Sequence, residues 1–334
     1  MILKVKIGSA SADSGEKSHG FVEVSRSPAG FPVGFPVNIV NGSKEGPTLV
    51  TSGAVKGNHI IGSLAIARLF KTLDPKQLRG TLVGVPVVNT WAFEAEDRVP
   101  TLLDHQNMAG LWPGRQSGAI SNRIAYAFLN DVVHRSDSCY LYFCDRERFW
   151  QPVDGGMLSP PKPEGWFTSE QYDKYLEWLK VFGVRHVWRT KGFHTVIDES
   201  MHQKGVVEIC IMLGGLADFR RKEQFVKQAM RGITNVMKRL GMVEGEIEKP
   251  GYKTRILDTQ EVSNRLGGIW YTDKEFDQEV KEGEVVATIS DPYTAEVLEE
   301  IRSPITGIIT SMWCNPVVKP AERVLGVGKL VETI

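Results

Sequence analysis

The chain has 334 residues, of which 42% are hydrophobic and 24% are charged, and its 40 Lys and Arg side chains balance its 40 Asp and Glu side chains. This composition excludes an intrinsically disordered chain, and the length allows one large domain and a small one. The balance of charge gives no reason to expect nucleic acid or an anionic membrane as a partner.

Four cysteines are widely spaced and form no CxxC pair: Cys139, Cys144, Cys210 and Cys314. The first three lie in apolar runs, so we expect buried free thiols in a reducing compartment rather than disulfides. No apolar run approaches the roughly 20 residues of a membrane span, and the N-terminus MILKVKIGSA lacks the apolar stretch of a signal peptide. We therefore predict a cytoplasmic protein without a membrane partner.

Residues 1–50 are predicted to form strands and turns, the last of which leads into the stretch TSGAVKGNHIIGSLAIARL at 51–69. The small residues at the start of this stretch end a buried strand, and Ile60, Leu64 and Ala67 then recur on one face of a helix. The chain therefore runs strand, tight turn, helix. Open α/β sheets place their sites in such turns, outside the carboxyl ends of strands.

The predicted helix ends near Asp74, and residues 78–89 then form a near-continuous apolar run, which is typical of a strand covered on both faces. The order strand, helix, strand implies a parallel pair with a right-handed crossover. The later predicted elements are a helix at 118–129, a strand at 136–144, a helix at 169–182, a strand at 206–215 and a helix at 225–240.

The segment at about 146–204 is interpreted as an insertion, because it is rich in Trp, Pro and Gly around its predicted helix. Long insertions often cap a site, and a surface excursion that packs its own aromatic side chains is the alternative. A charged linker at 244–253 follows the last helix. We predict a large α/β domain at 1–245 and a second domain of short strands and turns at 254–334.

The turn Lys56-Gly57-Asn58-His59, with Gly53 before it and Gly62 after it, resembles the G-x-x-H-G-N-E-x-x-G turn of the succinylglutamate desuccinylase/aspartoacylase family, relatives of the zinc carboxypeptidases. The resemblance continues in order through about residues 30–145 and 203–330. It implies an α/β fold with a zinc-carboxypeptidase-like mixed sheet flanked by helices. It also implies a small C-terminal β-barrel-like domain, similar to biotinyl and lipoyl carrier barrels.

In that family the His and Glu of the turn and a later His hold a zinc ion, which activates water for amide hydrolysis. The first two positions are Lys56 and His59 here. The third falls on Phe143, and a shift of one residue would place Cys144 there instead. Of Lys56, His59 and Phe143, only His59 is an ordinary zinc ligand.

The family's other functional groups are replaced as well. Its general base falls on Met212, and Glu208 lies four residues earlier, about 13 Å away at ~3.3 Å per residue, which makes it a poor substitute. The Asn-Arg pair that grips a substrate carboxylate falls on Ala109 and Gly110. The joint replacement of ligands, base and carboxylate grip argues against the family's amide hydrolysis.

Three further positions match the family and are candidates for substrate binding: Arg98, Asp104 and Arg123. For the two arginines, a structural ion pair is the simpler interpretation. The histidines of the predicted insertion carry no spacing signal.

We therefore predict a catalytically degenerate homologue of zinc-dependent N-acyl amino acid deacylases that has no cofactor. It would act by binding a small carboxylate-containing ligand or an active paralogue, and we expect an oligomer. One alternative is a divergent hydrolase or other enzyme with a rebuilt site, in which Lys56 and His59 are the catalytic candidates. The other groups available to such a site are Asp104, His105, Cys144 and Asp145. A further alternative retains a metal such as zinc through His59, Cys144 or Asp145.

Overall fold

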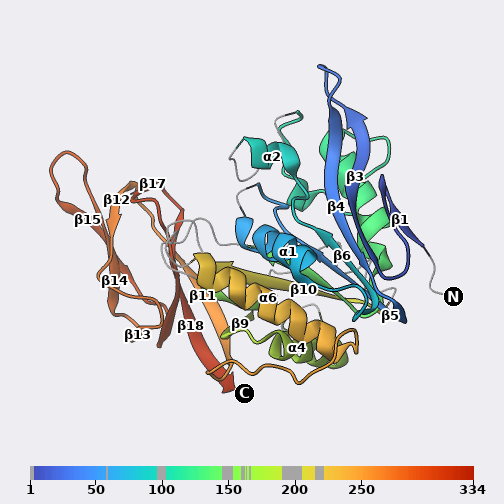
Figure 1. Ribbon diagram of the computed structural model, residues 1–334. Helices are drawn as coiled ribbons and strands as arrows, with labels where there is room; N and C mark the ends of the chain where they lie inside the picture. Colours follow the sequence, from blue (N-terminus) through green and yellow to red (C-terminus); the bar gives the residue numbers. More distant parts are fainter. Residues whose placement is uncertain are drawn as a thin grey trace.

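The computed structural model has a central mixed β-sheet flanked by helices, with a smaller group of strands at one end (Figure 1). It describes residues 4–57, 59–95, 103–144, 153–158, 162, 164, 167–189, 205–214 and 222–334. The helices are α1 (Ile60–Thr72), α2 (Thr90–Glu94), α3 (Ile120–Ala127), α4 (Ser169–Phe182) and α6 (Lys222–Arg239), with the short helices η1 (Met108–Gly110), η2 (Phe128–Val132) and η3 (Val133–Arg135).

The strands fall into two groups along the chain. The first group is β1 (Val5–Ile7), β2 (Ala10–Ala12), β3 (Glu16–Arg26), β4 (Pro32–Asn41), β5 (Lys44–Ser52), β6 (Arg79–Val85), β7 (Cys139–Cys144), β8 (Val153–Leu158), β9 (His186–Arg189) and β10 (Val207–Gly214). The second group is β11 (Arg255–Ser263), β12 (Gly268–Tyr271), β13 (Glu279–Val280), β14 (Val285–Ser290), β15 (Val297–Arg302), β16 (Gly307–Met312), β17 (Val317–Val318) and β18 (Arg323–Thr333).

Within the described ranges, the central sheet has the strand order β13-β16-β18-β11-β9-β8-β10-β7-β5-β6-β4-β3. Strand β5 pairs in parallel with both β6 and β7, and β7 pairs in parallel with β10. The parallel pairing predicted for the strands on either side of α1 is therefore confirmed. The outer strands β3 and β4 run antiparallel, so the sheet is mixed, as the predicted fold class requires.

Helices cover both faces of this sheet. Helices α1, α4 and α6 pack with one face in a single buried cluster, and α3, η2 and η3 pack with the other face in a second cluster. Figure 1 shows the first three helices together on one side. Neighbouring residues of β5 illustrate the division, because Leu49 belongs to the first cluster and Val50 to the second. This alternation is what a strand with two covered faces requires.

The segment predicted as an insertion contributes two strands to the central sheet. Strand β8 pairs antiparallel with β10 and parallel with β9, and β9 pairs in parallel with β11. Helix α4 has the predicted bounds because Thr168 and Gln171 form a reciprocal capping box and Gly183 ends the helix in the left-handed conformation. The described part of this segment is thus structural support rather than a surface excursion.

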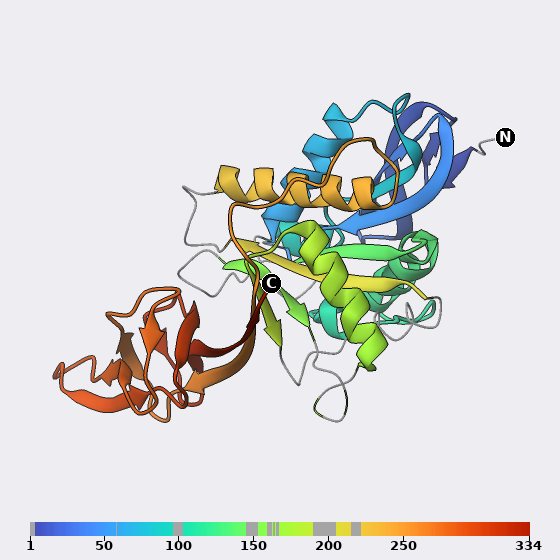
Figure 2. The same cartoon turned by 90° about the horizontal axis from the view of Figure 1, so that it is seen from below.

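The C-terminal strands form a smaller unit that projects from the main body (Figure 2). Four of them form a separate sheet in the order β15-β14-β12-β17 around a core of their own. The long strands β11 and β18 pair with each other and continue the central sheet beyond β9. The predicted domain limits at 245 and 254 fall in a segment between α6 and β11 that contains neither helix nor strand.

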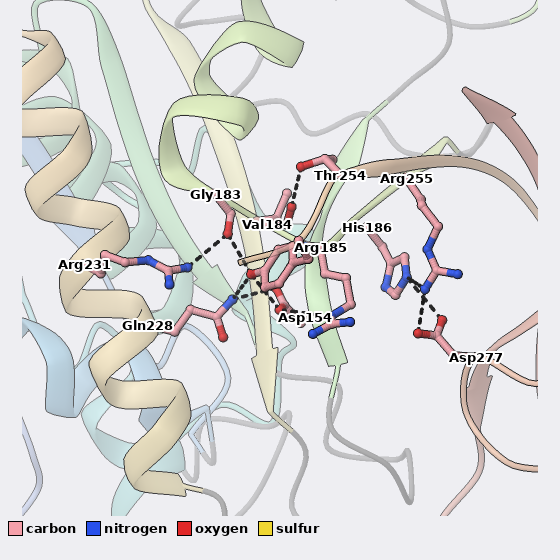
Figure 3. Close-up of polar contacts among 11 residues, drawn as sticks. Asp154, Gly183, Val184, Arg185, His186, Gln228, Arg231, Thr254, Arg255 and Asp277 are labelled. Carbon is pink, nitrogen blue, oxygen red and sulfur yellow. Dashed lines mark hydrogen bonds and ion pairs between the residues drawn. The ribbon is translucent and has the colours of Figure 1, made fainter. Parts of the chain in front are cut away.

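A polar cluster ties this unit to the central sheet (Figure 3). Asp277, which precedes β13, lies 2.5 Å from Nη2 of Arg255 on β11 and 3.2 Å from Nε2 of His186 on β9. Burial tends to raise the pKa of Asp277, but hydrogen bonds and charges from His186 and Arg255 outweigh it and hold the pKa below the ordinary value. The cluster therefore stabilises the ionised carboxylate.

A second cluster holds the segment after α6 against the sheet. The Asp154 carboxylate on β8 accepts hydrogen bonds from Nε2 of Gln228 at 2.6 Å and from the Tyr252 hydroxyl at 3.0 Å. It also accepts the backbone N–H of Arg185 at 3.1 Å, so three elements meet at one buried carboxylate (Figure 3).

None of the helices in the described ranges is both long enough and apolar enough to span a membrane.

The contact between α1 and β7 is close enough to require glycine. A Cβ added at Gly62 would lie 2.3 Å from Cβ of Phe143. We expect Gly62→Ala to lower the free energy of unfolding by about 1–3 kcal/mol, because the core must shift to admit the methyl group. Urea denaturation measures the change. The control is Gly251→Ala, whose added Cβ meets no atom within 4 Å; equal stability of both variants would contradict this packing.

The Asp277 cluster gives a pH-dependent expectation. Asp277→Asn should lower the free energy of unfolding at pH 7 by about 1.5–3 kcal/mol, because it removes hydrogen bonds between charged groups. A carboxyl group with a lowered native pKa stabilises the fold above its unfolded pKa of about 4, and this contribution is lost as the pH falls through the native pKa. The difference from the wild type should therefore shrink in acid. Asp273→Asn, on an exposed side chain, is the control.

Candidate functional site

A pocket of about 200 Å³ lies against β7 and β10 beneath the turn that follows β5. Its apolar wall includes Trp112, Met157 on β8 and Met212. Its polar lining consists of Lys56, Tyr140, Tyr142, Cys144, Glu208 and Cys210. Because β5, β7 and β10 are parallel, the pocket is at the end of the sheet where α/β proteins place their sites.

The alternation of side chains decides which residues reach the pocket. On β7, Leu141 and Phe143 pack into the cluster beneath α1, α4 and α6, whereas Tyr142 and Cys144 line the pocket. On β10, Glu208, Cys210 and Met212 line it in the same way. In the strand pairing Tyr142 stands opposite Cys210, so the two polar rows lie side by side.

The structure distinguishes the two residues on which the family's third ligand could fall. The Phe143 ring packs against Phe182, with 5.9 Å between ring centroids, and lies under Gly62 of α1. It is 1% exposed and faces the helices. Cys144 is therefore the residue at this strand end that faces the pocket.

The turn after β5 brings Lys56 and His59 to the same place. Gly53 allows α1 to approach the strand end, since a Cβ there would lie 2.7 Å from the backbone nitrogen of Ser63. The backbone N–H of His59 then donates to the carbonyl of Lys56 at 3.1 Å. Lys56 lines the pocket, and His59 is fully buried as the N-cap residue of α1.

The two thiols in the pocket have opposite pKa shifts. A hydrogen bond from Cys210 lowers the pKa of Cys144; burial opposes this, and the charge and hydrogen bond of His59 and the charge of Lys56 lower it further, so that it lies well below the ordinary value. The hydrogen bond with Cys144, burial and the charge of Cys144 raise the pKa of Cys210. The pair therefore favours a thiolate at Cys144 and a thiol donor at Cys210.

The two tyrosines remain hydrogen-bond donors. Burial, together with the charges of Glu208 and the thiols, raises the pKa of both Tyr140 and Tyr142 well above the ordinary value. The hydroxyl of Tyr140 lies 2.5 Å from Oγ of Ser52 on β5. Phenol donors beside the carboxyl group of Glu208 and the two cysteine sulfurs give the pocket a dense set of polar contacts.

Two of the predicted substrate-binding residues are engaged elsewhere in the structure. Asp104 accepts the backbone N–H and the hydroxyl of Ser121, both at 2.7 Å, at the beginning of α3. Arg123 donates to the Val24 carbonyl at 2.5 Å and to Oγ of Ser25 at 3.2 Å, and so holds α3 on β3. Neither residue lines the pocket. The candidates Arg98 and Asp145 lie outside the described residues. The other two candidates for metal binding, His59 and Cys144, lie at the pocket as described above.

Tyr142, Cys210 and Glu208 line the pocket but were not predicted as site residues from the sequence. Their common signal is the period of two along β7 and β10, which places alternate residues on one face once both strands are known to be adjacent. A sequence window cannot reveal that the two strands are adjacent, because more than sixty residues separate the end of β7 from the start of β10.

Zinc is the metal that the resemblance implies for this end of the sheet. A hydrolytic zinc site takes about three protein ligands and one open position. Among the described residues, no group of three or more His, Cys, Asp or Glu side chains is placed so as to hold a metal ion. The described side chains at this strand end therefore do not fit a hydrolytic zinc site.

Comparison with known proteins supports the resemblance drawn from the turn. The chain is 24% identical over 326 residues to the N-alpha-acetyl-L-2,4-diaminobutyric acid deacetylase of Halomonas elongata, covering 95% of this chain and 92% of that protein. No protein-family model matches the sequence.

Solved structures show the same fold. The succinylglutamate desuccinylase/aspartoacylase of Rhodobacter sphaeroides superposes with a TM-score of 0.82 at 20% identity, over 94% of this chain and 96% of that one. The product-bound ectoine utilization protein EutE (DoeB) of Ruegeria pomeroyi also gives 0.82 at 20% identity, over 93% and 95%. The resemblance to the succinylglutamate desuccinylase/aspartoacylase family is thus confirmed, and the chain has the fold of that family along nearly its whole length.

Proposed function

We propose that this chain is a relative of the N-acyl amino acid deacylases that has lost zinc-dependent hydrolysis and binds a small amino-acid-derived ligand in the pocket. The observation that carries the proposal is the identity of two lining side chains. Lys56 stands where the family has its first ligand, and Met212 stands where it has its general base. An ammonium group has no lone pair for a metal, and a thioether is too weak a base to take a proton from bound water.

The charges in the pocket suit a ligand that carries both signs. Lys56 can bind a carboxylate, and the buried carboxylate of Glu208 can bind an amino group. The Halomonas relative is named for a substrate of this kind, because Nα-acetyl-2,4-diaminobutyric acid has a carboxylate and a free side-chain amine. This agreement supports an acylated or free diamino acid as the ligand class.

The size of the pocket supports the same class. The volume of the pocket is about 200 Å³. It is smaller than the roughly 300–1,000 Å³ of pockets that take drug-sized ligands. A single amino acid derivative fits this volume, and a peptide does not.

Isothermal titration calorimetry with Nα-acetyl-2,4-diaminobutyrate and with free 2,4-diaminobutyrate tests the proposal. We expect binding to the wild type, weakened about 10- to 100-fold in Lys56→Met and in Glu208→Gln, because a hydrogen bond to a charged group contributes roughly 1.5–3 kcal/mol. Lys44→Met, on an exposed residue at the start of β5, is the matched control and should bind like the wild type.

The proposed loss of zinc-dependent hydrolysis is tested by metal analysis of protein purified without chelators, together with a deacylation assay on the same acetylated compound. We expect neither stoichiometric zinc nor zinc-dependent turnover. Stoichiometric zinc accompanied by turnover would overturn the proposal, and so would the absence of any binding to either diamino acid.

A further inference from the structure

Cys144 and Cys210 both line the pocket, and of the two Cys144 lies at the end of its strand, beside the turn that carries Lys56. No disulfide joins the four cysteines, all of which lie in described residues, and Cys139 belongs to the helix-facing cluster on the opposite side of the same strand. Cys144 instead ends β7 at the pocket, 8% exposed, beside Lys56 and Tyr142. A small molecule in the pocket would therefore meet this sulfur, whereas Cys139 is out of its reach.

Two donors contact the Cys144 sulfur. One is the thiol of Cys210, which lines the same pocket from the neighbouring strand, two residues before the Met212 that pairs with Cys144. The other is the imidazole of His59, at the start of α1. Because His59 is the N-cap residue of α1, it also brings the positive end of that helix close to the sulfur. A thiol next to a histidine and a helix N-terminus is the arrangement in which cysteine acts as a nucleophile.

We infer that Cys144 is a nucleophile that accepts the acyl group of a small acyl donor bound in the pocket, forming a thioester. This inference rests on the proposed ligand pocket but not on the identity of its ligand. In the step, the thiolate sulfur forms a bond to the carbonyl carbon, and the bond from that carbon to the leaving oxygen or nitrogen breaks with its electron pair. An ester leaves as an alkoxide or phenoxide, and an amide leaves as an amine after taking a proton from His59.

The remaining lining residues suit the charge that develops. The carbonyl oxygen becomes negative as the sulfur attacks, and the ammonium of Lys56 and the hydroxyl of Tyr142 line the same small pocket. Hydrolysis closes the cycle. Water adds to the thioester carbon and gives up one proton, which goes back to His59 or to the released alkoxide or phenoxide. The carbon–sulfur bond then breaks, Cys144 leaves as a thiolate, and the carboxylic acid product releases its own proton to solvent. No co-reactant besides water is needed.

The test uses the full-length protein and p-nitrophenyl acetate as the acyl donor. We expect a burst of one equivalent of p-nitrophenolate per chain and one added acetyl group on the peptide that contains Cys144, seen by mass spectrometry. Cys144→Ser should abolish the burst, and Cys139→Ser should keep it, since burial raises the pKa of Cys139 and keeps that thiol inert. Acetylation only at other residues of the folded wild type would overturn the inference even if Cys144→Ser failed to fold.

The pH dependence separates a nucleophile with positioned donors from an accessible thiol. The wild type should react below pH 8, under the ordinary thiol pKa of about 8.5. Cys210→Ala removes the main donor, so its pH–rate midpoint should move upward, and Cys210→Ser should restore it because a hydroxyl can still donate. A midpoint that is the same in all three proteins contradicts the role of Cys210.

The two proposals can fail separately. If Cys144→Ser still binds the diamino acid by calorimetry while the wild type shows no acetylation at Cys144, the nucleophile is excluded and the binding function stands. If Cys144 is acetylated but no diamino acid binds, the ligand class is excluded and the nucleophile stands.

Discussion

The site depends on one constraint, which is that β7 and β10 lie side by side in the middle of the sheet with both faces covered. Every second side chain of each strand packs against helices α1, α4 and α6, because this buries apolar surface. The remaining side chains are forced together on the opposite face, where they form the pocket. A shift of one residue would exchange the two sets, and Phe143 beneath Gly62 prevents it.

The electrostatics of the pocket follow from the same arrangement. In zinc enzymes the ion is the largest local charge and lowers the pKa of the groups around it. Here the ammonium of Lys56 and the imidazole of His59 supply positive charge at the matching turn, and the group whose pKa they help to lower is the thiol of Cys144. The turn after β5 thus places positive charge at this end of the strands. The sulfur is in the position to use that charge.

Much of the fold could be predicted from the sequence, because its signals are local. The apolar runs of β5, β6, β7 and β10 and the helical stripe of α6 have periods that a short window reveals. Three features could not be predicted: that Cys144 faces the pocket, that Cys210 lies next to it, and that Asp104 is bonded away from the pocket. They depend on which strands become neighbours and on whether a polar group finds a nearer partner, such as Ser121 for Asp104. Such pairings are decided by tertiary packing.

The segment that was interpreted as an insertion illustrates this limit and also explains how the pocket is held. Its Trp-rich and Gly-rich composition obscures β8 and β9, yet β8 supplies the pocket wall through Met157 and anchors Asp154. Strand β9 then connects β8 to β11, and His186 on β9 meets Asp277 of the C-terminal unit. One wall of the pocket is therefore continuous with the smaller unit through two strand pairings, β8 with β9 and β9 with β11. A pocket built on paired strands keeps its polar groups in fixed positions, which is the condition under which a small set of charges can select a small ligand.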